Sequence, residues 1–147
     1  MPSSQVLPVE FLKVAIESQA RSLRGQQARP ILTNQFERRV ATEMPVGELL
    51  ADADASLISA TCATEAFEVA MAKKIPLGFD DPVSYTRDFG GKIPGARPSM
   101  YLDFLAKRRC EIDAINGAIP VAAAEEGMTA PANVVVSSLI RSKESRF

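Results

Sequence analysis

The sequence predicts an all-α fold, and three features of it support that prediction. In most segments, apolar residues recur at the three- and four-residue spacing of a helix face. Prolines and glycines stand between these segments, where helices would begin or end. No pair of strands joined by a turn is indicated, because the apolar run Val134 to Val136 is too short and isolated to form a sheet.

The first 44 residues carry the least regular pattern. Apolar residues spaced from Val9 to Leu23 predict one helix, and Gly25 is a suitable place for it to end. A second, mostly polar helix is expected from about Leu32 to Glu43. We therefore divide the chain into a divergent N-terminal helical segment, residues 1–44, and a helical domain, residues 45–147.

The clearest helical pattern runs from about Ala55 to Lys73. Either Asp52 or Asp54 is expected to cap its first turn, and Pro76 prevents the helix from continuing. Glu65 interrupts the edge of the apolar side and is interpreted as a solvated flank. The residues predicted to form one broad buried stripe are Leu57, Ile58, Thr61, Cys62, Ala66, Val69 and Ala70.

Two short helices are predicted next, separated by a loop rich in glycine and proline. The first covers Asp81 to Phe89 and has Pro82 at its first position, where a missing N–H costs nothing. The second follows Pro98.

Two further helices complete the predicted fold. A helical stretch from about Cys110 to Glu126 should kink or break just before Pro120, and Gly127 should end it. The last helix begins near Pro131. Its apolar positions are Val134, Val135, Leu139 and Ile140.

Composition excludes several classes of protein. The chain has 147 residues, 46% hydrophobic and 24% charged, which is enough for one hydrophobic core. Its net charge of -1 gives no excess of positive charge for nucleic acid or an anionic membrane. Because histidine is absent, a histidine-built metal site and a Ser-His-Asp triad are excluded, and we expect no metal. No apolar run reaches membrane-spanning length and no signal peptide is evident, so a cytoplasmic location is expected.

The two cysteines, Cys62 and Cys110, do not form a disulfide framework. We expect both to be small buried hydrophobic residues. An alternative for Cys110 is a reactive thiol at a helix N-terminus, next to Arg108 and Arg109.

Four segments of the chain resemble the C-terminal helical domain of ketopantoate (2-dehydropantoate 2-) reductases. Residues 98–103, PSMYLD, and 109–118, RCEIDAINGA, are similar to the family signature SM-x-x-D followed by TEID-x-ING. Residues 127–133, GMTAPAN, resemble its GV-x-x-P-x-N turn, and residues 46–50, VGELL, resemble its vGEL segment. The resemblance covers residues 45–147.

This resemblance implies a reaction and two site residues. The family reduces ketopantoate to pantoate with NADPH, in pantothenate biosynthesis, in a cleft between a Rossmann domain and the helical domain. By resemblance, Ser99 takes the substrate-binding position and Glu111 the catalytic position. A hydroxyl at a helix start suits a substrate carboxylate, and an ionised glutamate keeps a neighbouring lysine protonated for proton donation. Outside the family, both residue types are also common at helix starts for purely structural reasons.

The sequence also departs from the family pattern. It contains no G-x-G-x-x-G fingerprint, so we expect this chain to bind no cofactor, although the full-length family uses NADPH. The family's catalytic lysine is followed by two asparagines in a K-x3-N-x3-N motif, which is absent here. Lys13 is instead followed at this spacing by Glu17 and Arg21, and it is interpreted as a solvated helix residue. In the family signature, Ala96 replaces an asparagine and Cys110 a threonine.

These observations leave three functions open. The first is a substrate-side helical domain of a reductase-like protein that is inactive alone, and that either works with a separate Rossmann-domain chain or is a relic. The second is a helical interaction or dimerisation module, in which a homodimer covers apolar surface. The third is a binder of a small acid that uses Ser99 and Glu111 without chemistry.

Overall fold

The computed structural model describes residues 46–92, 94–95 and 99–147, and for residues 99–101 it describes the backbone only. The helices predicted within residues 1–44 lie outside this part of the chain. The described helices are α3 (Val46–Ala51), α4 (Ala53–Ala72), α5 (Pro82–Lys92), α6 (Ser99–Leu105), α7 (Ala118–Glu125) and α8 (Pro131–Glu144). Since these residues contain no strand, the all-α prediction is confirmed.

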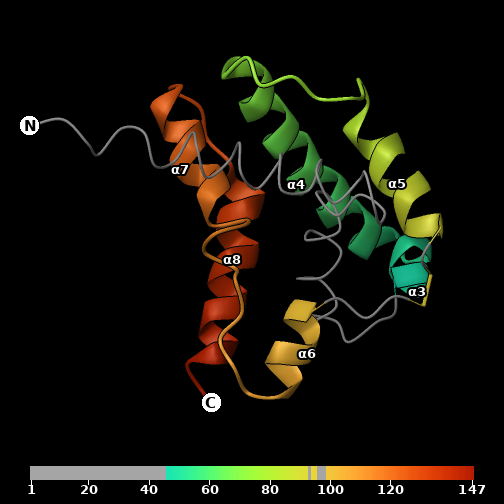
Figure 1. Ribbon diagram of the computed structural model, residues 1–147, viewed down its shortest axis with the longest axis vertical. Helices are drawn as coiled ribbons and strands as arrows, with labels where there is room; N and C mark the ends of the chain where they lie inside the picture. The colour runs from blue at the N-terminus through green and yellow to red at the C-terminus, as the bar shows by residue number, and fades with distance from the viewer. Residues whose placement is uncertain (1–45, 93, 96–98) are drawn as a thin grey trace, which may run out of the picture.

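Helix α4 is the central element of the described fold. It contacts α3 and α5 on one side and α7 and α8 on the other (Figure 1). Asp52 caps its first turn, since the backbone N–H of Ala55 donates to Asp52 Oδ1 at 2.6 Å. The choice left open between Asp52 and Asp54 is thereby resolved. Caps of this kind typically stabilise a helix by about 1 kcal/mol.

The buried face of α4 differs from the predicted stripe. Cys62, Val69 and Ala70 are buried as predicted, but Leu57 is 65% exposed, and Ile58 and Thr61 are also exposed. The prediction was therefore wrong for the first turns of the helix. The residues that α4 does bury are mostly small, namely Ala55, Ser59, Cys62, Ala63, Glu65, Val69 and Ala70. Small side chains allow neighbouring helices to approach closely, which apolar periodicity alone does not reveal.

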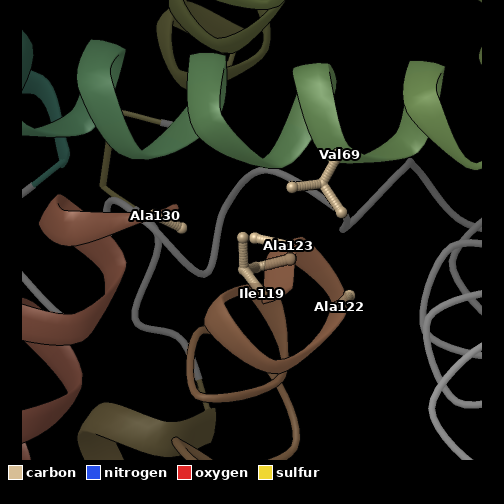
Figure 2. Close-up of a cluster of buried hydrophobic side chains, with 5 residues drawn as sticks. All are labelled: Val69, Ile119, Ala122, Ala123 and Ala130. Atoms are coloured by element: carbon tan, nitrogen blue, oxygen red, sulfur yellow. The ribbon is translucent and has the colours of Figure 1, made fainter. Parts of the chain in front are cut away.

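The main hydrophobic cluster joins α4 to α7 and to the start of α8. Val69 of α4 lies over Ile119 and Ala123 of α7, and Ala130 just before α8 completes this side (Figure 2). A second cluster forms around Ile112 and Ile140, which link the turn before α7 to α8. These two clusters hold α7, α8 and the intervening turns in fixed relation to α4.

The segment from residue 110 to residue 117 is a series of turns and not the predicted helix. The predicted break before Pro120 is present, because α7 begins only at Ala118. The backbone N–H of Gly117 donates to the carbonyl of Ile112 at 2.9 Å, which tightens the chain. A Cβ at Gly117 would lie 2.8 Å from Asp113 Cα, so this close approach requires glycine. Pro120 then falls in the first turn of α7, where an N–H has no helical partner.

The remaining helix boundaries agree with the sequence, except for the end of α5. Helix α5 has Pro82 at its first position and extends past the predicted end to Lys92. Gly127, with φ of +68°, terminates α7 as expected. Helix α8 starts at Pro131.

The buried face of α8 coincides only in part with the apolar positions of its sequence. Ile140 is buried, whereas Val134, Val135 and Leu139 are exposed. The buried positions are Asn133, Val136, Ser137, Ile140 and Glu144. Several of these buried residues are polar, so the apolar positions of the sequence do not mark the face of α8 that packs against the rest of the fold. No helix within the described ranges is long and apolar enough to span a membrane.

Candidate functional site

Glu111 projects into solvent from a turn whose neighbouring residues are held in place. The backbone N–H of Cys110 donates to Glu144 Oε1 at 2.7 Å, and Ile112 is only 1% exposed and packs near Ile140. The Glu111 side chain itself is exposed. An ionisable group on a restrained backbone, open to solvent, is suited to contact a small polar ligand.

The structure corrects the helical setting predicted for Glu111. It does not lie in the first turn of a helix, because α7 begins only at Ala118. The dipole of that helix therefore does not act on the Glu111 side chain. The same correction applies to the alternative role for Cys110, which required a helix N-terminus. Cys62 is buried as predicted, and Cys110 is half-buried.

Ser99 is the first residue of α6. The resemblance implies that the Ser99 hydroxyl and the Glu111 carboxylate lie at one substrate site. Because the Ser99 side chain is outside the described atoms, this stays a prediction. The connection between α6 and the Glu111 turn is ordered by local contacts. Arg108 folds back on α6, with its Nη2 2.6 Å and its Nε 3.0 Å from Asp103 Oδ1. Since this pair is exposed, its main effect is on loop geometry rather than on stability.

Glu65 has a role that sequence reasoning missed. It was interpreted as a solvated flank, but it is 8% exposed and caps α8 from a distant part of the chain. Its Oε1 accepts from the backbone N–H of Ala132 at 2.8 Å, and its Oε2 from that of Asn133 at 3.0 Å. Asn133 Nδ2 also donates to Glu65 Oε2, at 2.7 Å, and to the carbonyl of Cys62, at 3.2 Å.

A sequence signal for this capping role existed. The residue before α8 is Ala130, which has no side-chain acceptor for the free N–H groups of the first turn. A buried helix start without its own cap must find acceptors elsewhere. An acidic residue within the apolar pattern of α4 is a natural candidate, and its negative charge suits the helix N-terminus.

Two other ionic groups serve the fold. Lys73 at the end of α4 pairs with Glu125 at 2.6 Å and with Glu126 at 3.3 Å. Burial works to lower the pKa of Lys73, but the hydrogen bonds and charges of these two glutamates outweigh it and raise that pKa. Glu125 is the last residue of α7 and Glu126 follows it, so these ion pairs join the ends of α4 and α7. In the described part of the chain, no group of three acidic or cysteine residues is placed to hold a metal.

Comparison with protein families identifies the domain. The model for "Ketopantoate reductase PanE/ApbA C terminal" matches residues 39–144. The chain belongs to this family. The match includes Ser99, Glu111 and the segment that caps α8, so the resemblance read from the motifs is confirmed.

Solved structures of ketopantoate reductases and of a D-mandelate dehydrogenase share this fold. A ketopantoate reductase from Ralstonia eutropha is 25% identical, with a TM-score of 0.72, over 98% of this chain and 43% of that chain. A D-mandelate dehydrogenase in complex with NADH is 22% identical, with a TM-score of 0.69, over 98% of this chain and 44% of that chain. A dimeric ketopantoate reductase from Staphylococcus aureus is 16% identical, with a TM-score of 0.65, over 98% and 45%.

The chain thus spans less than half the length of each of these three proteins. Residues 39–144 match the C-terminal domain of the family, and the regular secondary structure of the described residues is all helical. No curated protein matches the chain.

Proposed function

We propose that residues 45–147 are the substrate-side helical domain of a 2-dehydropantoate 2-reductase-like protein. The observation that carries the proposal is the exposed Glu111 on an anchored turn. The resemblance of its motif to the family signature assigns it the catalytic position. A carboxylate there accepts a hydrogen bond from the 2-hydroxyl of pantoate. The Ser99 hydroxyl, at the start of α6, donates to the carboxylate of the same ligand.

We further propose that this domain is inactive by itself. Reduction of ketopantoate needs NADPH, held by a Rossmann domain, and a proton donor for the developing alkoxide. The sequence offers neither the dinucleotide fingerprint nor the K-x3-N-x3-N motif. A nucleotide-binding domain, in the same polypeptide or in a separate chain, would supply the cofactor. A cytoplasmic location and a part in pantothenate biosynthesis belong to this same proposal.

A second candidate function is supported by exposed apolar side chains. Leu57 and Ile58 on α4 are exposed, as are Val134, Val135 and Leu139 on α8. Apolar residues on the outer faces of two helices are typical of a surface that associates with a partner. A homodimer, or a complex with a Rossmann-domain chain, would cover them. The module would then work by association and not by chemistry.

Ligand binding tests the first proposal against the second. The unfolding temperature of the chain should rise in the presence of pantoate and ketopantoate, because a ligand that binds only the folded state stabilises it. The rise should be lost in Glu111→Gln and kept in Glu68→Gln, which changes an exposed glutamate on α4 in the same way. Calorimetry with NADPH should show no heat. Micromolar binding of NADPH would contradict the claim that another domain holds the cofactor.

A further inference from the structure

The last residues of the chain reach the Glu111 turn and its surroundings at three points. Glu144, at the end of α8, accepts the backbone N–H of Cys110 at 2.7 Å. Arg141 Nη1 lies 2.7 Å from Asp113 Oδ1. The ring of Phe147 meets that of Phe104, on α6, edge to face with centroids 5.0 Å apart. Figure 1 shows the segment after α6 running beside this end of α8.

These contacts bracket Glu111 along the chain. Cys110 immediately precedes it, and Asp113 follows two residues later. Between them Ile112 is buried against Ile140 of α8. The backbone that carries Glu111 is therefore attached to α8 on both sides, while the Glu111 side chain remains free to meet a ligand.

The three contacts are not of equal weight. Arg141 and Asp113 have side chains that are 46% and 75% exposed, so water readily replaces their ion pair. Glu144 is 8% exposed, and a buried carboxylate acceptor cannot be replaced by water without loss. Its bond to a backbone N–H is also charge-assisted, which makes it stronger than one between neutral groups. Of the two polar contacts to the turn, the one made by Glu144 is thus the stronger restraint.

We propose that Glu144 is a positioning residue for the substrate site. Its carboxylate holds the backbone at Cys110 and thereby sets the direction in which Glu111 leaves the turn. This inference rests on the proposed function of Glu111. It adds that the end of the last helix, far from Glu111 in sequence, determines whether the ligand-facing carboxylate is in place.

The test compares three substitutions at residue 144 in the full chain. Glu144→Gln keeps an oxygen acceptor, Glu144→Asp shortens the reach, and Glu144→Ala removes the acceptor. Pantoate affinity, measured by amide chemical-shift titration, should fall about tenfold or more in Glu144→Ala. It should fall less in Glu144→Asp and least in Glu144→Gln, which keeps the reach and the acceptor oxygen and loses only the charge. Arg141→Ala, which removes the exposed pair, should change the affinity less than twofold. If Glu144→Ala does not fold, the Asp and Gln variants decide. A larger loss of pantoate affinity in Glu144→Asp than in Glu144→Gln supports the inference, and the reverse order contradicts it.

A second measurement needs no ligand. Amide ¹⁵N relaxation should show that Glu111 and Cys110 become more mobile in Glu144→Ala and regain order in Glu144→Gln. A purely structural contact would lower the melting temperature without this local effect. Unchanged mobility and unchanged affinity in Glu144→Ala would overturn the inference. If the unsubstituted chain binds no pantoate, the proposed function fails, and the relaxation data alone decide whether Glu144 positions the turn.

Discussion

In the described part of the chain, the buried carboxylates of Glu65 and Glu144 each hold a distant backbone segment by accepting its N–H groups. Glu65 accepts two backbone donors at the start of α8 and a third donor from the Asn133 side chain. Glu144 accepts one donor beside Glu111. In both cases the carboxylate is buried and its partners are far away in sequence. Loss of such a hydrogen bond is destabilising, because water cannot reach the buried groups to replace the missing partner.

Removal of the Glu65 cap should therefore destabilise the fold. Glu65→Ala leaves the N–H groups of Ala132 and Asn133 and the amide of Asn133 short of an acceptor. We expect a loss of about 1–3 kcal/mol in the free energy of unfolding. Chemical denaturation followed by circular dichroism measures it. Glu68→Ala, an exposed change three residues away on the same helix, should stay within about 0.5 kcal/mol. Equal losses in the two variants would show that Glu65 is not a cap.

At the scale of elements, the ends of helices were predicted more accurately than their buried faces. Asp52, Pro82, Gly127 and Pro131 act within a turn of their own position, so a local pattern is enough to place them. Burial of a face depends on which helices lie against it. Leu57 has apolar character at the right spacing, yet nothing in the described fold covers it.

At the candidate site too, the local motif was predictable from the sequence and the packing around it was not. Glu111 could be chosen from its motif, but its exposure is a finding of the structure that the sequence did not predict. Its helical setting was wrong, because the approach of Gly117 to Asp113 depends on packing that the sequence does not display. Glu65 and Glu144 were missed because their partners lie in other elements.

A methyl group added at Gly117, in the turn before α7, should lower the stability of the fold. In Gly117→Ala the new Cβ would meet the Asp113 backbone at 2.8 Å, so the turn must open. We expect a loss of about 1–3 kcal/mol in the free energy of unfolding. Gly91→Ala is the matched control, because open space surrounds that position near the end of α5. It should be neutral or slightly stabilising, by up to about 1 kcal/mol. A neutral Gly117→Ala would contradict the described turn.

The start of α5 should be sensitive to acid. Asp81 accepts the Ser84 hydroxyl and the N–H groups of Ser84 and Val83, and these hydrogen bonds lower its pKa from 3.8. A lowered pKa in the folded state means that the stabilisation is fully present above pH 3.8 and is lost as the pH falls through the folded value. The melting-temperature difference between the unsubstituted chain and Asp81→Ala should therefore narrow below that pH. A difference that widens in acid would contradict this role.

At the scale of the whole molecule, the described fold leaves apolar residues uncovered on α4 and α8. If a second copy covers them, light scattering should give about twice the mass of the 15.9 kDa chain. Val135→Glu combined with Leu139→Glu places charge on the exposed side of α8 and should yield a monomer without loss of helicity. A monomer of the unsubstituted chain at high concentration would end the homodimer proposal and leave the substrate-side domain unaffected.

The account depends most on the claim that Glu111 faces a small hydroxy acid. The most direct measurement is a titration of the ¹⁵N-labelled chain with pantoate, followed at every assigned amide. The account predicts saturable shifts concentrated in residues 110–117 and at the start of α6, and their loss in Glu111→Gln. Shifts confined to other parts of the molecule, or equal in the Glu111→Gln variant, would contradict it.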